Sequence, residues 1–170
     1  MNWKVLFVGA ILVVPLVWIL ASGFGHNPRA IPTTTIGSQA ADFELETLEG
    51  ETLRLSDLRG TPVVLNFWST WCPPCVQEHP LLQAAARAHG EDIRFFGVLY
   101  GDEPGRARAY LERAGSAYPT LVDDDQRIIV DYGVAGVPET FFIDSRGVIV
   151  QKVSGGISGN QLMAALEGLD

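Results

Sequence analysis

Both cysteines of the chain stand close together, in the sequence Trp71-Cys72-Pro73-Pro74-Cys75. Two thiols separated by two residues can be oxidised to a disulfide and reduced again, so that one sulfur attacks a substrate disulfide and the other resolves the mixed disulfide. We expect Cys72 to be the attacking nucleophile and Cys75 to be the resolving thiol. The spacing indicates thiol–disulfide exchange, in which the two sulfurs carry both electrons and no cofactor is required.

A buried strand is predicted to end, and a helix to begin, at this cysteine pair. Pro62–Trp68 is a near-continuous apolar run, which is typical of a strand buried on both faces, and Pro73–His89 has apolar residues at helical spacing. Unpaired N–H groups and a partial positive charge in the first helical turn favour a thiolate, so we predict a pKa for Cys72 below its free value of about 8.5. Pro73 and Pro74 stiffen this turn but remove N–H donors.

Strand and helix patterns alternate along the rest of the chain. An edge strand is predicted at Phe43–Leu45 with a partner at Thr52–Leu55, and Ser56 and Asp57 offer a cap for one short helical turn. Further strands are predicted at Ile93–Leu99, Thr120–Val122, Thr140–Asp144 and Val148–Val153, and helices at Glu103–Ala114, Gln126–Tyr132 and Ser158–Leu169. The alternation predicts an α/β fold with helices on both faces of one sheet.

Three other interpretations of the cysteine pair are weaker. As a structural disulfide, the four-residue loop would stabilise the protein by only about 2 kcal/mol. A zinc site would lack a second cysteine pair and would need His79 and His89 to complete it. A haem attachment site is excluded because Val76, and not histidine, follows Cys75. Exchange chemistry therefore remains the favoured interpretation.

The first 25 residues have the pattern of a membrane anchor. Residues 5–25 are almost entirely apolar and, at about 1.5 Å per residue, long enough to cross a hydrocarbon layer of ~30 Å. Residues 1–4 form a short positive start, which by the positive-inside rule lies in the cytoplasm and leaves the rest of the chain outside. A cleaved signal is the alternative, with Ala21-Ser22-Gly23 as the cleavage site.

The remainder of the chain is acidic and large enough for one domain. Residues 26–38, rich in proline and threonine, are expected to form an extended linker, and residues 39–170 a folded domain with its own core. All twenty acidic residues follow the anchor together with eleven basic ones, and the resulting net charge of −9 argues against a nucleic-acid partner. Asp123–Asp125 lack the spacing of a cation site, so we expect a solvated turn and no bound metal.

The surroundings of the cysteines resemble thioredoxin. Trp68 stands four residues before Cys72, Pro80 stands eight after it, and Gly136-Val137-Pro138 is similar to the cis-proline loop of that family. The resemblance implies a thioredoxin-like fold, with a central mixed sheet and helices on both faces. It also implies that the backbone of Val137 pairs with a substrate chain beside Cys72, as a short added strand.

A closer resemblance, over essentially the whole chain, is to the thiol:disulfide interchange proteins of the DsbE (CcmG) type. It is carried by the entry segment Asn27–Leu45, by Glu78-His79-Pro80, and most specifically by Tyr132-Gly-Val-Ala-Gly-Val-Pro-Glu-Thr-Phe-Phe-Ile-Asp144. The resemblance implies a single-pass protein of the inner membrane whose domain faces the periplasm and reduces apocytochrome c before haem attachment. A DsbD- or CcdA-type membrane thiol transporter would re-reduce it, and the haem-ligation machinery is a further implied partner.

The resemblance also implies which residues support the cysteines. Asn66 occupies the position at which cytosolic thioredoxins have a buried aspartate, six residues before the first cysteine. Glu78 and Glu139 would replace that carboxylate, because a carboxylate near Cys75 can accept its proton. Exposed positions for both glutamates are the alternative.

Four neighbouring residues complete the expected site. Val137, Pro138 and Glu139 would contact the substrate, and Trp71 is expected to form a surface platform for it. Trp68 is expected in the core. His79 is expected to be an exposed helix residue, with stacking near the site as the alternative.

Several functions therefore remain open at this stage. The runner-up is a ResA- or TlpA-like anchored reductase that acts on another envelope protein. A DsbA-like oxidant has little support, and a peroxiredoxin is disfavoured because Thr70 stands two residues before Cys72 where that family has threonine three before. A non-catalytic docking module of the haem-ligation assembly is the alternative from a different functional class.

Overall fold

The computed structural model describes residues 36–169 and, before them, only Trp3 and Val13. The chain divides into two units, Met1–Ile31 and Pro32–Asp170, and the fold reported below is that of the second. Apart from Trp3 and Val13, the predicted cytoplasmic start and anchor lie outside the described residues, as does the linker as far as residue 35. Within the described part of the chain, no helix has the length and hydropathy needed to cross a membrane.

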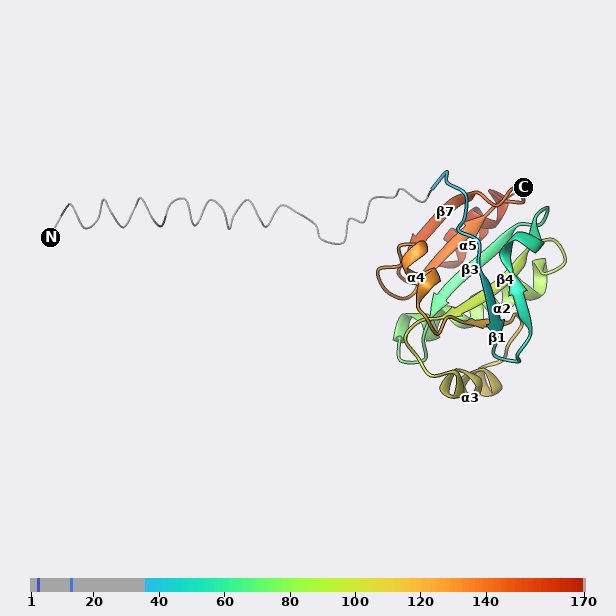
Figure 1. Ribbon diagram of the computed structural model, residues 1–170, viewed down its shortest axis with the longest axis horizontal. Coiled ribbons are helices and arrows are strands. Elements are labelled where there is room, and N and C mark those ends of the chain that lie inside the picture. The colour runs from blue at the N-terminus through green and yellow to red at the C-terminus, as the bar shows by residue number, and fades with distance from the viewer. Residues whose placement is uncertain (1–2, 4–12, 14–35, 170) are drawn as a thin grey trace. The chain divides into compact units, whose positions relative to one another are not determined.

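A mixed seven-stranded sheet forms the centre of the domain (Figure 1). The strand order is β2-β1-β5-β4-β3-β6-β7, and β3 pairs in parallel with β4 and antiparallel with β6. The strands are β1 (Glu44–Thr47), β2 (Thr52–Arg54), β3 (Val63–Trp68), β4 (Arg94–Leu99), β5 (Thr120–Val122), β6 (Glu139–Ile143) and β7 (Ile149–Ser154). The predicted central mixed sheet is confirmed.

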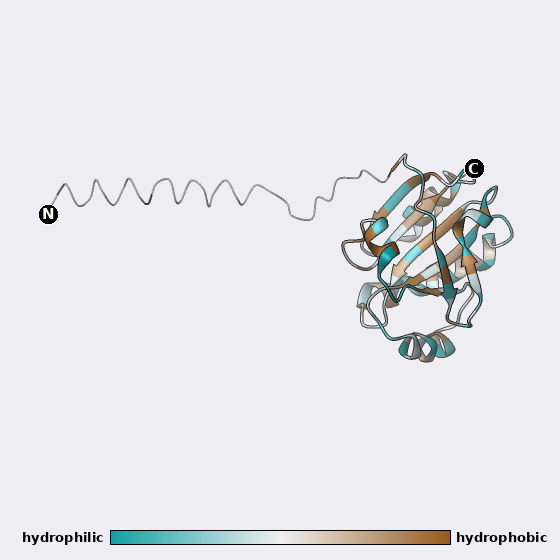
Figure 2. Ribbon diagram, in the orientation of Figure 1, coloured by the Kyte–Doolittle hydropathy of each residue, from teal (hydrophilic) through white to brown (hydrophobic). Residues whose placement is uncertain are grey.

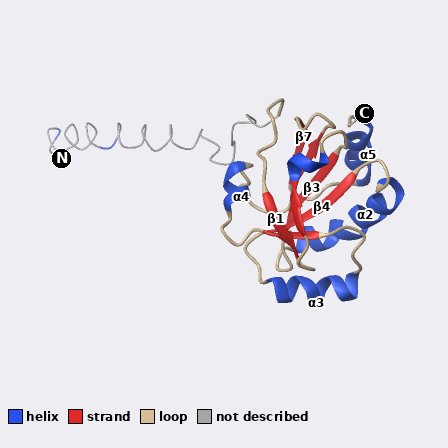
Figure 3. Ribbon diagram, turned by 45° about the vertical axis from the view of Figure 1, so that its right-hand side comes forward, coloured by secondary structure: helices blue, strands red, loops and turns tan. Residues whose placement is uncertain are grey.

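Helices cover both faces of this sheet (Figure 3). On one face α2 and α5 pack against Val64 and Phe142, and on the other α4 packs against Phe67 and Phe141. The helix α3 packs at the end of the sheet over Trp68, beside the two cysteines. The bounds are η1 (Leu55–Leu58, a short 3-10 turn), α2 (Pro73–His89), α3 (Pro104–Ala114), α4 (Arg127–Asp131) and α5 (Gly159–Glu167). This is the architecture that the thioredoxin resemblance implies.

The central strand β3 is buried along its whole length, as its apolar run predicts. Because side chains alternate between the two faces of a strand, Val64 and Asn66 point toward α2 while Leu65 and Phe67 point toward α4. Figure 2 shows the central strands largely in brown, the hydrophobic end of the scale. The carboxyl end of β3 leads directly into the turn that carries the cysteines.

Three expectations about the outer elements are wrong. The strand β1 is not an edge strand, because β5 pairs with it on the side away from β2. The short turn η1 has no side-chain cap of its own. Instead, Ser56 donates its backbone N–H to the carboxylate of Asp42.

The third error concerns Asp123, which is buried and not part of a solvated turn. Its two carboxylate oxygens accept hydrogen bonds from the backbone N–H groups of Arg127, Ile128 and Ile129. These donors form the first turn of α4, where N–H groups lack partners inside the helix. Asp123 is therefore buried because it accepts the hydrogen bonds of these N–H groups. Asp124 and Asp125 are exposed.

Candidate active site

Cys72 and Cys75 form a disulfide, with their Cα atoms 5.3 Å apart. Cys72 is the N-cap residue of α2, and its Sγ accepts a hydrogen bond from the backbone N–H of Cys75 at 3.3 Å. Pro73 and Pro74 occupy the first positions of the helix, where a missing N–H costs no intrahelical bond. The structure therefore places the pair at the junction of β3 and α2, as the sequence predicts.

Both cysteines are buried just below an exposed surface. Each cysteine is only 3% exposed, whereas Trp71, Pro73 and Pro74 are exposed around them. The Trp71 side chain is 54% exposed, which confirms its predicted place on the surface. A substrate disulfide must therefore approach closely along this apolar rim to reach a sulfur.

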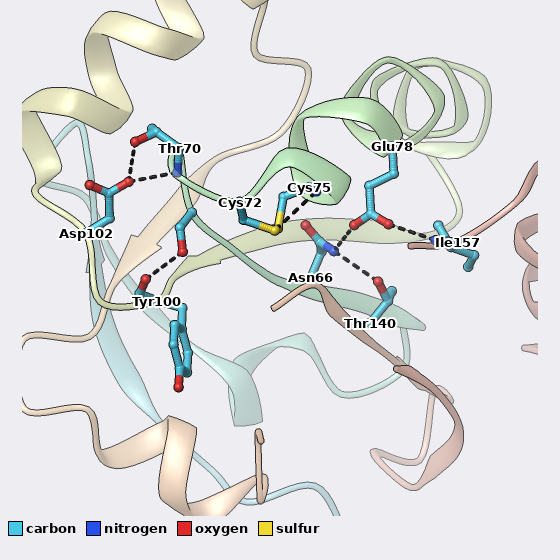
Figure 4. The surroundings of a disulfide bond; sticks show 10 residues. Asn66, Thr70, Cys72, Cys75, Glu78, Tyr100, Asp102, Thr140 and Ile157 are labelled. Carbon is cyan, nitrogen blue, oxygen red and sulfur yellow. Dashed lines mark hydrogen bonds between the residues drawn. A yellow bond between two sulfur atoms is a disulfide. The ribbon is translucent and has the colours of Figure 1, made fainter. Parts of the chain in front are cut away.

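Glu78 lies one helical turn beyond Cys75, so both side chains occupy the same face of α2. Glu78 is 5% exposed and accepts two hydrogen bonds: from Asn66 Nδ2 to Oε1 at 2.9 Å, and from the Ile157 N–H to Oε2 at 2.8 Å. Asn66 Nδ2 also donates to Thr140 Oγ1 at 3.0 Å (Figure 4). The structure thus brings Cys75, Glu78 and Asn66 together, and Glu78 is not a solvated helix residue.

The surroundings of Glu78 make its carboxyl a weaker acid than an exposed glutamate. Burial raises the pKa of the Glu78 carboxyl, and the hydrogen bonds from Ile157 and Asn66, which act to lower it, do not cancel this effect. Among the ion pairs of the described residues, none includes Glu78. A carboxyl whose pKa is raised toward the working pH can both accept and return a proton.

Glu139 is buried in a different environment. It alternates with Thr140 along β6, so it points to the opposite face of the sheet from the Asn66–Thr140 contact. Its Oε2 lies 2.8 Å from Lys152 Nζ, and its Oε1 accepts a hydrogen bond from Ser154 Oγ at 3.1 Å. The structure does not bring the two predicted glutamates into one cluster.

Lys152 is a site residue that the sequence analysis missed. Its ammonium group pairs with Glu139, donates to the Gly133 carbonyl at 3.3 Å and lies 4.9 Å from the centre of the Phe141 ring. The signal in the sequence was a single lysine in the predicted strand Val148–Val153, in which Gln151 is the only other polar residue. A lysine that is nearly buried in a strand needs an anionic partner.

The loop before β6 adopts the expected conformation. The Val137–Pro138 peptide bond is cis, and the Pro138 carbonyl accepts a hydrogen bond from the Gly155 N–H at 2.8 Å. The side chain of Val137 packs against the cluster that contains both cysteines. The pairing of the Val137 backbone with a substrate chain stays a prediction.

His79 is buried, and the prediction of an exposed histidine is wrong. Its ring packs against Trp68 and Tyr110, and its Nε2 lies 3.0 Å from the Gly115 carbonyl. Burial lowers the pKa of His79, and the contact with this carbonyl only partly opposes the change. The histidine therefore joins α2 to the end of α3, through its contact with the Gly115 carbonyl and the packing of its ring against two aromatic side chains.

Trp68 is buried between these rings, as expected. Its indole crosses β4 at Gly97, where a Cβ atom would lie 2.6 Å from Trp68 Nε1. Glycine is therefore required at this point of the sheet. Trp68, His79 and Tyr110 thus form one cluster of packed rings at the end of β3.

A second missed residue, Asp102, contacts the turn from the loop after β4. Its Oδ2 accepts hydrogen bonds from the Thr70 N–H at 2.7 Å and from Thr70 Oγ1 at 2.5 Å (Figure 4). The same loop accepts a bond from Trp71 Nε1 at the Gly101 carbonyl, 3.1 Å away. Nothing in the local pattern around Asp102 indicated these contacts.

Among the described residues, no group of three histidine, cysteine or acidic side chains is placed to hold a metal ion. The chemistry available at the site is that of two sulfurs, a buried carboxyl group and the backbone around them.

The sequence matches known proteins along most of its length. Residues 36–152 match the AhpC/TSA family. The thiol:disulfide interchange protein DsbE of Allochromatium vinosum is 37% identical over 149 residues, which cover 86% of this chain and 81% of the relative. The chain belongs to the DsbE-type proteins of this family. It is accordingly a thiol:disulfide oxidoreductase, and Cys72 and Cys75 are its redox pair.

This DsbE-type chain is also similar to a ResA protein and to a solved structure. The thiol-disulfide oxidoreductase ResA of Geobacillus thermodenitrificans is 31% identical over 160 residues, covering 94% of this chain and 90% of the relative. The structure of MTB dsbF superposes with a TM-score of 0.70 at 29% identity, covering 75% of this chain and 95% of that one. The thioredoxin-like fold is therefore shared with solved members of the superfamily.

Proposed function

We propose that this protein is anchored in the inner membrane with its domain in the periplasm, where it reduces disulfides of apocytochrome c before haem attachment. The observation that carries the proposed exchange chemistry is Glu78, a buried carboxyl group outside the described ion pairs and one turn along α2 from Cys75. The direction of electron flow rests on the similarity to DsbE-type proteins. The apocytochrome substrate, the location and the anchor rest on the similarity to DsbE-type proteins and on the apolar residues 5–25.

The first step of the proposed cycle takes place at Cys72. Its thiolate attacks one sulfur of a substrate disulfide, which forms a mixed disulfide and releases the other substrate sulfur as a thiolate. The backbone at Val137 pairs with the substrate chain beside the attacked sulfur, while Pro138 and Glu139 shape that edge. Trp71 offers an exposed apolar surface to the same chain.

The second step returns the pair to the observed oxidised state. Cys75 gives its proton to Glu78 and attacks Cys72, so that the Cys72–Cys75 disulfide forms and the second substrate sulfur leaves as a thiolate. Two electrons have then passed to the substrate, and Glu78 returns the proton when the pair is reduced again. A membrane thiol transporter of the DsbD or CcdA type is the proposed reductant, and the haem-ligation machinery is the proposed recipient of the reduced substrate.

The reduction potential of the full-length protein, measured by tryptophan fluorescence in thiol buffers, tests the direction of the reaction. A value between roughly −200 and −270 mV, in the range from glutaredoxins to thioredoxin, is expected for an electron donor. A value near about −120 mV, as in DsbA, would make the protein an oxidant and would reverse the proposal.

Deletion of the gene tests the substrate. We expect c-type cytochromes to be lost and to be restored by the wild-type gene, but not by a gene in which Cys72 and Cys75 are both replaced by serine. Restoration by that variant would favour a docking module whose thiols are dispensable. The similarity to ResA supports a second candidate, an anchored reductase for another envelope protein, and a deletion that loses copper-oxidase assembly while keeping cytochrome c would favour it.

A further inference from the structure

All four residues before Cys72 are held by the loop that follows β4. Trp68 accepts a backbone hydrogen bond from Tyr100 at 2.9 Å, and Ser69 Oγ donates to the Tyr100 carbonyl at 2.7 Å. Thr70 donates twice to Asp102, and Trp71 Nε1 donates to Gly101. Residues 100–102 therefore form hydrogen bonds with every residue of the segment 68–71 that leads to Cys72.

Among these contacts, only those of Asp102 use a charged group. One carboxylate oxygen takes both Thr70 bonds, and the other accepts the Glu103 N–H at 2.8 Å, immediately before the first residue of α3. Hydrogen bonds to an ionised acceptor are shorter and roughly twice as strong as those between neutral groups. The carboxylate thus links the cysteine turn to the start of α3.

The contacts also favour the ionised form of Asp102. Partial burial acts to raise the pKa of its carboxyl, but the hydrogen bonds from Thr70 and Glu103, together with the charge of Arg106, outweigh burial, and the pKa lies below its ordinary value.

We propose that Asp102 is a positioning residue of the exchange reaction, which acts through Thr70 to hold Cys72 in the geometry for attack. This inference rests on the proposed function only in taking Cys72 as the nucleophile. Thr70 is two residues from Cys72, so a change in its backbone position shifts the sulfur against the incoming disulfide. A displacement of about 1 Å at a reacting group can cost 10²-fold in rate.

The test is the rate at which reduced full-length protein cleaves Ellman's reagent, followed as released thionitrobenzoate over a range of pH. Cys72 attacks the aromatic disulfide and releases the first thionitrobenzoate, and Cys75 then releases the second. Asp102→Ala and Thr70→Val are each expected to lower the rate plateau by about tenfold without moving the pH midpoint. Thr70→Ser, which keeps both donors, should restore the wild-type rate.

Two comparisons separate positioning from other effects. The double variant Asp102→Ala/Thr70→Val should be no slower than Asp102→Ala alone, because Asp102→Ala already removes the side-chain bond that Thr70→Val removes. Glu103→Ala removes the neighbouring carboxylate, whose side chain makes no cap bond, and should leave the rate unchanged. Circular dichroism on each variant checks that the fold is retained, and Thr70→Val keeps the backbone bond to Asp102 in any case.

The proposal is overturned if Thr70→Val reacts at the wild-type rate, if Glu103→Ala slows the reaction as much as Asp102→Ala, or if the two single effects multiply in the double variant. The proposal is also overturned if the pH midpoint shifts in both Asp102→Ala and Glu103→Ala but not in Thr70→Val. The effect would then come from the loss of negative charge and not from positioning. Failure of the wild-type protein to cleave the reagent would instead contradict the proposed function itself.

Discussion

Two buried glutamates lie on opposite faces of the central sheet, and their partners differ in charge. Glu78 accepts hydrogen bonds from neutral groups, the Asn66 amide and the Ile157 N–H, whereas Glu139 pairs with the ammonium group of Lys152. Burial raises the pKa of Glu78, and its two hydrogen bonds only partly oppose this effect. The proposed proton exchange therefore involves Glu78, whereas the contacts of Glu139 lie within the β6–β7 hairpin.

The largest effect is expected from breaking the Glu139–Lys152 pair. Lys152→Met leaves a buried carboxylate without its cation and should lower the free energy of unfolding by about 3–5 kcal/mol. Urea denaturation measures the loss. The double variant Lys152→Met/Glu139→Gln should regain most of it, and removing the exposed Arg54 of the Arg54–Glu44 pair should leave the urea midpoint unchanged. A Lys152→Met protein as stable as the wild type would contradict the assignment of Glu139.

The second effect concerns the rate of the resolving step. Glu78→Gln removes the proton acceptor of Cys75 at constant size, and we expect resolution of the mixed disulfide to slow by about 10²-fold. Trapping the mixed disulfide with acid and measuring its lifetime tests this. The Lys152→Met/Glu139→Gln protein is the control and should resolve at close to the wild-type rate. Equal slowing in both proteins would remove the distinction between the two glutamates.

A smaller effect is expected from Asn66→Asp, which places a second carboxyl group against Glu78. Two carboxylates about 3 Å apart do not ionise together, so the pair should retain one proton to higher pH. We expect the pH midpoint of the resolving step to rise by about one unit, which corresponds to about 1.4 kcal/mol. Gln77→Glu adds the same charge at an exposed position of α2 and should leave the midpoint unchanged. An unshifted midpoint in Asn66→Asp would mean that Glu78 does not govern it.

The smallest effect is a dependence of stability on pH. Because burial raises the pKa of Glu78 in the folded protein, the folded state keeps a proton that the unfolded chain loses above about pH 4.3. The stability that this proton provides is complete below that pH and is lost as pH rises through the folded pKa. Glu78→Gln has no such loss. Measured by urea denaturation, the free energy of unfolding of Glu78→Gln relative to that of the wild type should therefore be higher at pH 8 than at pH 4. Parallel behaviour of the two proteins would contradict the raised pKa.

Local patterns in the sequence were enough to place the redox pair and the elements around it. The apolar run before Trp68 predicted the buried strand β3, and the prolines and apolar spacing after Cys72 predicted α2 with its observed bounds. These features depend on residues a few positions apart, whose backbone preferences and periodicity are written in the chain itself. The position of β1 failed, because the strand that covers it, β5, comes more than 70 residues later.

The sequence by itself determined the chemistry of this protein: two cysteines at a helix start, an acidic domain and an apolar N-terminal segment. Tertiary structure alone decided which hydrogen-bond or ion-pair partner each buried polar side chain has. Glu78 meets the N–H of a residue 79 positions later, Thr70 meets Asp102 across 32 positions, and Glu139 meets a lysine on the next strand. Strand order and register bring these pairs of residues into contact. Burial then requires that each charged group has a hydrogen-bonding or oppositely charged partner.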